Sequence, residues 1–200
     1  MRLSKLISII LHPIFMPIIA LCLTLKLIPN IGLAITNYLS FIYLILLFST
    51  IILPLMSLFF LIKNKTVSSL EISNYKERSA PLFITALWMW LGYYLIKDIL
   101  VLAPILKLEL IGAIILLFIA SIISKYWKIS LHMLGIGGLF GVLFSLNILF
   151  GGLLQAMILS VLLSGILGVA RRNEKAHNNS QIYIGFLIGF LIETVGILLF

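Results

Sequence analysis

The polar segment 170–181 concentrates the side chains that phosphate binding uses. It reads Ala-Arg-Arg-Asn-Glu-Lys-Ala-His-Asn-Asn-Ser-Gln and lies between two long apolar runs. Arg171 and His177 are six positions apart, and Arg172 and Lys175 lie between them. Guanidinium groups bind phosphate through two hydrogen bonds at once, and a neutral imidazole can attack phosphorus. The segment therefore predicts a phosphate site.

The place of His177 relative to the next helix supports the same prediction. The next membrane-length apolar run begins at about Gln181, so His177 falls just ahead of a helix N-terminus, where unpaired N–H groups attract anions. A plainer interpretation is a cytoplasmic loop whose lysines and arginines only set membrane topology. On this loop alone the plainer interpretation is the stronger one, so the phosphate hypothesis depends on the neighbouring loops.

The composition places these residues in a membrane protein. Of the 200 residues, 62% are hydrophobic and 10% are charged, and the mean hydropathy is +1.26. A membrane crossing needs about 20 mainly apolar residues, so we expect an all-α, polytopic transmembrane helix bundle with six or seven spans. The apolar runs are continuous rather than alternating, which disfavours a β-barrel. We expect residues 1–200 to form a single integral-membrane domain.

Seven apolar segments can be marked along the chain. Pro13 and Pro17 can split a short piece from the start of the first segment, and Pro54 predicts a kink in the second. Gly151 and Gly152 allow a tight turn between the fifth and sixth segments. The segments run from about Leu6 to Ile28, Asn37 to Ile62, Pro81 to Ala103, Lys107 to Ser124, Leu131 to Phe150, the Gly152 turn to Val169, and Gln181 to Phe200.

Counting crossings places the N-terminus and the loops 63–80, 125–130 and 170–180 on one side of the membrane. That side holds eleven of the cations and the other three, so we expect it to be cytoplasmic. The net charge of +8 lies in short juxtamembrane loops, so we expect no nucleic-acid partner. The eleven are Arg2, Lys5, Lys63, Lys65, Lys76, Arg78, Lys125, Lys128, Arg171, Arg172 and Lys175; the three are Lys26, Lys97 and Lys107.

The same count brings three helix starts together on that face. Segments three, five and seven begin there, near Pro81, Leu131 and Gln181. Their N-termini add partial positive charge to the basic side chains. The region is therefore predicted to bind a polyanion through Arg78, Ser130, His132, Arg171 and His177.

In type and order these residues resemble the motifs of the type-2 phosphatidic-acid phosphatase superfamily, which reads Lys-x6-Arg-Pro, then Pro-Ser-Gly-His, then Ser-Arg-x5-His-x3-Asp. The resemblance covers roughly residues 63–200. The third motif matches at Ala170, Arg171, His177 and Gln181, and the second at Ile129, Ser130, Leu131 and His132. The first matches least: two residues separate Arg78 from Pro81, and Glu71 stands where the family has lysine.

The resemblance implies a membrane phosphatase that hydrolyses a lipid or polyprenyl phosphate or diphosphate without a metal or other cofactor. His177 would be the nucleophile that forms a phosphohistidine, and His132 the acid that protonates the leaving oxygen. Arg171, Ser130 and Arg78 would hold the phosphate oxygens. Gln181 stands where the family has the aspartate that orients the nucleophilic histidine. We expect a protein of the bacterial inner membrane, with the site on the face that the cation count indicates to be cytoplasmic.

Gln181 also opens an alternative, because an amide accepts a hydrogen bond but carries no charge. In a serine protease, the change from aspartate to asparagine at the orienting position costs about ten-thousandfold in rate. In this alternative, the chain is a catalytically inactive relative that binds anionic lipid or serves as a subunit of a membrane complex. Transport has the least support, and the sequence leaves homo-oligomer formation open.

Three further residues have a structural interpretation beside a functional one. His12 precedes Pro13 on the site face, where an interfacial role is commoner than a place at the site entrance. Glu174 is close enough to substitute for the missing aspartate, although it precedes His177. Glu193 lies about twelve residues into the last segment, and we expect it to be neutral or paired inside the bundle.

Overall fold

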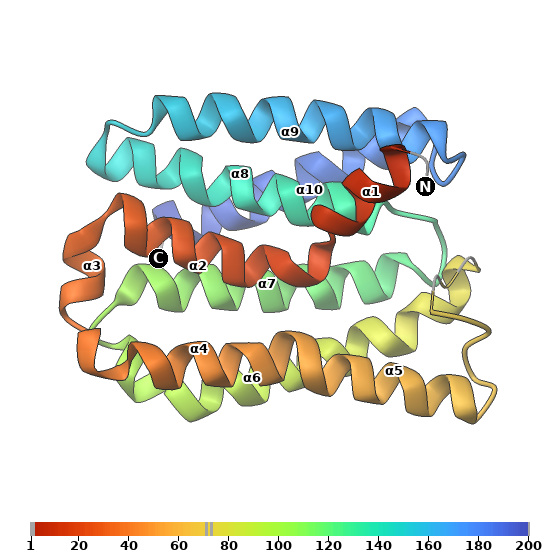
Figure 1. The fold of residues 1–200 in the computed structure, drawn as a ribbon, viewed down its shortest axis with the longest axis horizontal. Coiled ribbons are helices and arrows are strands. Elements are labelled where there is room, and N and C mark those ends of the chain that lie inside the picture. Colours follow the sequence, from red (N-terminus) through yellow and green to blue (C-terminus); the bar gives the residue numbers. More distant parts are fainter. Residues whose placement is uncertain (1–2, 71, 73, 200) are drawn as a thin grey trace.

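The computed structural model of the chain describes residues 3–70, 72 and 74–199, and its regular elements are all helical. Arg2 and Glu71, both named above, lie outside the described residues. The elements, labelled in Figure 1, are α1 Leu3–Ile10, η1 Pro13–Phe15, α2 Met16–Leu27, α3 Pro29–Leu33, η2 Thr36–Tyr38, α4 Leu39–Leu47, η3 Phe48–Ile52, α5 Leu53–Lys63, η4 Tyr75–Arg78, α6 Ser79–Leu100, α7 Pro104–Ile123, α8 Leu131–Phe150, α9 Leu154–Asn173 and α10 Asn179–Leu199.

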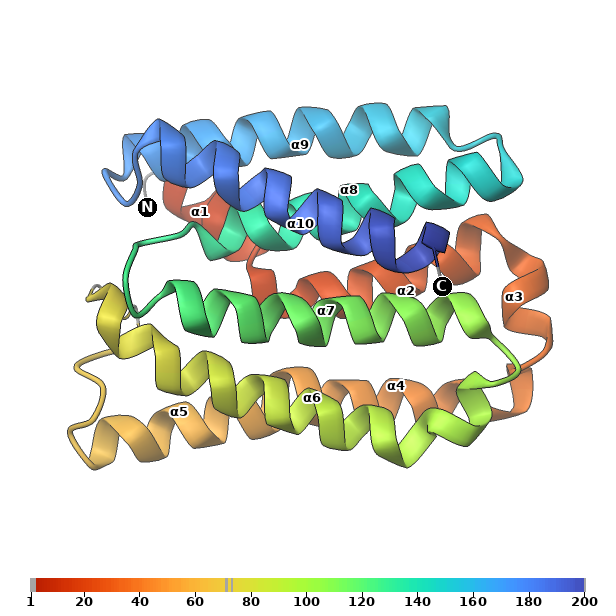
Figure 2. The same ribbon diagram turned by 180° about the vertical axis from the view of Figure 1, so that it is seen from behind.

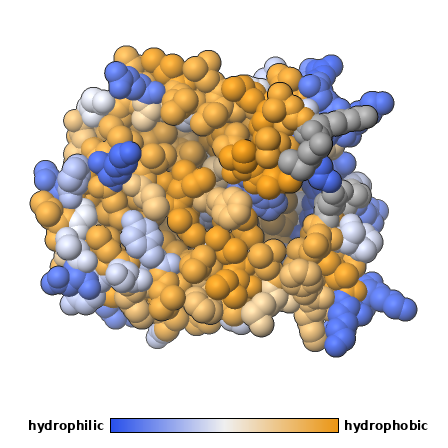
Figure 3. Space-filling view, viewed as in Figure 1, coloured by the Kyte–Doolittle hydropathy of each residue, from blue (hydrophilic) through white to orange (hydrophobic). Residues whose placement is uncertain are grey.

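Seven helical stretches of the described chain are long and apolar enough to cross a membrane. The predicted all-α bundle is confirmed, and the chain is an integral membrane protein. The stretches are Leu3–Leu27, Thr36–Lys63, Tyr75–Leu100, Pro104–Ile123, Leu131–Phe150, Leu154–Asn173 and Asn179–Leu199. Many large apolar side chains are exposed, and hydrophobic residues cover much of the face shown in Figure 3.

Two segment boundaries differ from the sequence prediction in a way that matters for the site. Helix α9 continues to Asn173 and α10 starts at Asn179, so residues 174–178 alone connect them. The predicted loop was therefore too long, because two arginines are good helix formers and favour the C-terminal end of a helix dipole. Arg171 and Arg172 lie in the last turn of α9, where the helix fixes their directions.

The ends of the spans meet as the crossing count predicted. Figure 1 shows α1, the α5–α6 connection, the α7–α8 connection and the α9–α10 connection at the same end of the bundle, and Figure 2 shows the same arrangement from behind. Across the bundle the helices lie in rows: α9 is outermost, α8 and α10 come next, then α2 and α7, and finally α4–α5 with α6. We refer to the shared end as the loop end of the bundle.

The first two spans are interrupted where prolines occur. In the first, α1 ends at Ile10 and a 3-10 turn at Pro13–Phe15 leads into α2, so the predicted separation of a short piece is confirmed. In the second, a π-helical turn covers Phe48–Ile52 immediately before Pro54. Proline offers no N–H to the preceding turn, and a π turn absorbs that loss without breaking the helix.

Helices α8 and α10 form the closest pair in the bundle because glycines face backbone across it. A Cβ atom on Gly137 would overlap the carbonyl of Phe186, and one on Gly189 would overlap the carbonyl of Leu134. Such approach is possible only where the side chain is absent. The contact aligns the starts of the two helices.

Substitution at this contact tests its contribution to stability. Gly189→Ala should lower the thermal unfolding temperature, because the added methyl meets backbone that has no rotamer to change, at a cost of about 1–3 kcal/mol. Gly196→Ala on the same helix is the matched control, since a Cβ there has no heavy atom within 4 Å. Equal unfolding temperatures of the two variants in detergent would contradict the proposed packing.

Candidate functional site

A cavity of about 450 Å³ extends between the helices. Its walls are mainly apolar, with leucines from α2, α4, α5, α6, α7 and α8. Five basic side chains line it: His12, Arg78, His132, Arg171 and His177. Each belongs to a helix end or connection at the loop end, so together they form a basic mouth. Figure 3 shows a hollow in the apolar face, with hydrophilic atoms in its depth.

His177 lies in the 174–178 connection and is buried, with 7% of its surface exposed. Its Nδ1 lies 3.0 Å from Oε1 of Gln181, which also accepts the backbone N–H of Asn178 at 3.3 Å. Because Oε1 accepts in both contacts, Nδ1 carries the proton. Nε2 therefore keeps its lone pair, which is the tautomer that a nucleophile needs.

The surroundings of His177 keep its imidazole neutral. The pKa of His177 is lowered to about 4: burial is the main cause, the Gln181 hydrogen bond opposes it, and the nearby cations Arg171, Arg78 and Lys128 add to the lowering. In the unfolded chain the imidazole has its ordinary pKa of 6.5, so the unfolded state binds the proton more tightly than the folded state does. His177 therefore supports folding fully above about pH 6.5, and that contribution is lost as the pH falls toward 4.

Arg171 is held beside the mouth by an acidic partner. Its Nη1 donates to Glu174 Oε2 at 2.6 Å and to the Ser8 hydroxyl at 3.2 Å. The Ser8 hydroxyl in turn donates to the same Glu174 oxygen at 3.3 Å. Glu174 thus pairs with the arginine rather than with His177, so in this structure it does not take the place of the orienting aspartate.

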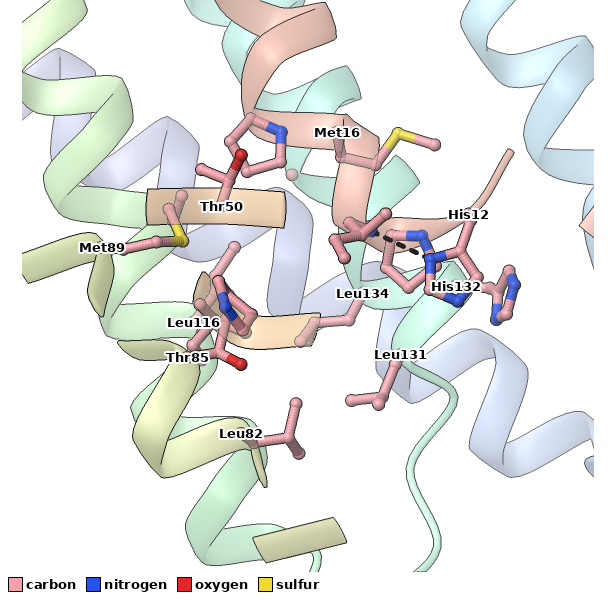
Figure 4. Close-up of a pocket in the computed structure, with 18 of the residues that line it drawn as sticks. His12, Met16, Thr50, Leu82, Thr85, Met89, Leu116, Leu131, His132 and Leu134 are labelled. Atoms are coloured by element: carbon pink, nitrogen blue, oxygen red, sulfur yellow. Dashed lines mark hydrogen bonds between the residues drawn. The ribbon is translucent and has the colours of Figure 1, made fainter. Parts of the chain in front are cut away.

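His132 lies in the first turn of α8, and its ring is packed edge-on against His12, with ring centroids 5.2 Å apart. His132 Nε2 is 3.0 Å from the backbone carbonyl of Ser8. A carbonyl only accepts, so Nε2 carries a proton and donates it there. Figure 4 shows the two imidazoles side by side at the cavity wall, next to Leu131 and Leu134. His12 therefore lines the cavity while part of its side chain is exposed.

Arg78 reaches the cavity from η4, directly before α6. Its Nε donates to the backbone carbonyl of Ile72 at 2.9 Å, which fixes the guanidinium against the 64–74 connection. Lys128 lies near the same cations: burial lowers the pKa of its ammonium, and Arg78 and Arg171 lower it further. The sequence indicates only a role in membrane orientation for Lys128, although it stands two residues before Ser130.

Not every predicted residue joins the mouth. Ser130 is fully buried at the start of α8 and does not line the cavity; its backbone N–H donates to the Gln181 carbonyl at 3.4 Å. No hydrogen-bond partner for its hydroxyl is found among the described residues. Arg172 is exposed and donates to the Asn179 side chain, and Lys175 is exposed with φ of +52°. These two cations of the predicted site point elsewhere.

The arrangement combines an anion-binding end with an apolar interior. Two guanidinium groups, three imidazoles and a neighbouring ammonium lie near a single described carboxylate, that of Glu174, so the mouth favours an anion with more than one negative charge. Beyond them the cavity is bounded by hydrocarbon, for example Leu82, Met89 and Leu116 in Figure 4. A molecule with a phosphate head and an apolar tail matches both parts. Ser8 was not considered from the sequence, because a lone serine in an apolar run carries no signal.

Two adjacent arginines allow a controlled test of anion binding. Arg171→Gln should weaken binding of inorganic phosphate by roughly 10- to 100-fold, since a hydrogen bond to a charged group contributes about 1.5–3 kcal/mol. Arg172→Gln removes the same charge from the exposed face of the same helical turn and should leave the affinity unchanged. Titration calorimetry on both detergent-solubilised variants checks this. Equal losses would mean that only the total charge matters.

Comparison of the chain with protein-family models, with curated proteins and with solved structures finds no match. The similarity to the phosphatase superfamily therefore stays where the sequence placed it, in the order and spacing of residues around Arg78, His132, Arg171 and His177. The chemistry of the basic mouth and of the cavity behind it is therefore the guide to the function of this protein.

Proposed function

We propose that the protein is a membrane phosphatase that hydrolyses a lipid or polyprenyl phosphate or diphosphate. The observation that carries the proposal is that one cavity joins the basic mouth to an apolar interior within the membrane-spanning bundle. The phosphate head would lie between Arg78 and Arg171, and the hydrocarbon tail would lie among the helices. The excess of basic residues at the loop end favours a cytoplasmic site, in keeping with a bacterial inner membrane.

In this proposal the reaction has two steps. Nε2 of His177 attacks phosphorus, so an N–P bond forms while the bond from phosphorus to the lipid oxygen breaks. The lipid oxygen takes the Nε2 proton of His132 in its imidazolium form, replacing the Ser8 carbonyl as the acceptor of that N–H. Water then attacks the phosphohistidine and gives a proton back to His132, which releases inorganic phosphate and restores both histidines. The guanidinium groups stabilise the negative charge on the transferred phosphoryl group.

The second candidate is a protein that binds such a lipid without cleaving it. Two contacts favour it: the partner of His177 is the neutral amide of Gln181, and Arg171 already has the Glu174 carboxylate as its ion pair. An amide fixes the tautomer of His177 but gives no charge to stabilise the imidazolium-like intermediate. A phosphate would also compete with Glu174 for the arginine.

Phosphate release separates the two candidates. Purified protein in detergent, incubated with phosphatidic acid and with a polyprenyl diphosphate, should release inorganic phosphate above the protein-free background. His177→Ala should reduce release to that background, because no nucleophile remains. Arg172→Gln should behave as wild type. Equal release by wild type and His177→Ala on both substrates, with lipid binding retained, would overturn the phosphatase and leave the binding protein.

The identity of residue 181 sets the expected rate. Gln181→Glu keeps the length of the side chain and the contact with Nδ1 of His177, but adds a negative charge that stabilises the cationic ring in the transition state. Phosphate release should rise at least tenfold, on the scale of the protease comparison of about ten-thousandfold. Asn37→Asp adds the same single negative charge at an exposed position at the other end of the bundle and controls for the change in net charge. A rate in Gln181→Glu no higher than in wild type would contradict an electrostatic role for this position.

A further inference from the structure

A second polar cluster lies at the inner end of the cavity, away from the basic mouth. Glu109 and Glu193 both line the cavity, and both are buried, with 5% and 4% of their surfaces exposed. Glu193 is fourteen positions after the first residue of α10, which is about 21 Å along the helix axis. The two acids are therefore separated from the mouth by the apolar part of the cavity.

Glu109 is held in place through one of its two oxygens. The hydroxyl of Thr24 on α2 donates to Glu109 Oε1 at 2.6 Å. The other oxygen, Oε2, has no hydrogen-bond partner among the described residues, although it is buried beside the cavity. One acceptor position of Glu109 is thus satisfied and the other is left open at the cavity.

Glu193 occupies a slot that glycines leave for it. A Cβ atom on Gly112 of α7 would overlap the Glu193 carboxylate, and one on Gly141 of α8 would lie 3.0 Å from its Cβ. Gly112 is three residues after Glu109, so both carboxyl groups lie against the same face of α7. Oε2 of Glu193 also has no partner within the described part of the chain.

Among the residues that the structure describes, no cationic side chain pairs with these carboxyl groups. The cations that line the cavity, Arg78 and Arg171, are at the mouth. The described hydrogen bonds and ion pairs join neither carboxyl to a basic group. On the packed helices α2, α7, α8 and α10 the other titratable side chains are Cys22, Lys26, Lys107, His132 and Tyr183. Two bare carboxylates side by side in a membrane interior are too costly to persist.

A proton fits this site better than a metal ion does. Hard metal cations such as Ca²⁺ and Mg²⁺ take about six or more oxygen ligands. Here two carboxyl groups and one hydroxyl face hydrocarbon, and the described residues contain no group of three metal-ligating acids, histidines or cysteines. A proton needs one oxygen and turns the open carboxyl oxygen into a donor.

We propose that Glu109 and Glu193 form an intramembrane proton-binding site that exchanges protons with solvent through the cavity. The site goes beyond the phosphatase proposal and does not depend on it. Protonation removes the two negative charges from the inner wall, so that the hydrocarbon tail of a lipid can lie against it. The cavity then binds an anion at one end and holds protons at the other.

Infrared spectroscopy of the purified protein in lipid nanodiscs tests this site without any substrate. Wild type should show the C=O stretching band of a protonated carboxyl group at neutral pH, and the band should shift in D2O. Glu109→Gln and Glu193→Gln should each remove part of the band, and the double variant all of it. Asp98→Asn should leave it unchanged, since Asp98 is exposed and near Lys97.

The proposal would be overturned by the absence of a band in folded wild type, by a band that survives in the double variant, or by a band that does not shift in D2O. It would also be overturned by a band that appears only when Na⁺ salts are replaced by choline salts, because the site would then bind a metal cation. Gly112→Ala covers the case in which the glutamine variants do not fold. It keeps both acids and displaces the Glu193 carboxyl, so the band should change in frequency.

Discussion

The close contact between α8 and α10 determines both ends of the cavity. Gly137 on α8 and Gly189 on α10 let backbone meet backbone, which fixes one register for the two helices. In that register the Ser130 N–H bonds to the Gln181 carbonyl, so His132 and His177 enter the same mouth. About one turn beyond Gly189 along α10, the same packing places Glu193 against Gly138 and Gly141. A bulkier residue at the contact would separate the helices and move all of these groups.

The mouth illustrates how a low-dielectric setting can serve chemistry. Several cations share a small volume, and burial with their mutual repulsion lowers the pKa of His177 and of Lys128. Repulsion disfavours a proton on His177 Nε2, so the ring stays neutral and able to attack. An arriving phosphate reverses the balance, because its charge is stabilised by the same groups that repel one another. The unfavourable repulsion among the cations is thus offset when an anion binds.

Much of the fold followed from the sequence, because apolar run length and the crossing count are governed by membrane thickness. The same count brought Arg78, His132, Arg171 and His177 to one end. Side-chain partners could not be predicted this way. Arg172 looked equivalent to Arg171 until α9 was seen to continue through both, which turns one into the cavity and the other outward. Nothing in the sequence marks Glu109, since only the packing of Glu193 against Gly112 on the same helix brings the two acids together.

A carboxylate at position 181 would assist His177 in two ways, and the amide of Gln181 supplies only one of them. One part is geometric: an acceptor 3.0 Å from Nδ1 selects the tautomer, and Gln181 supplies this. The other part is electrostatic, since a charge is needed when the ring becomes cationic, and an amide cannot supply it. In the proposed phosphatase, a site that retains the geometry and lacks the charge would bind phosphate but form the phosphohistidine slowly. Turnover would then be limited by electrostatics at one residue rather than by the fold.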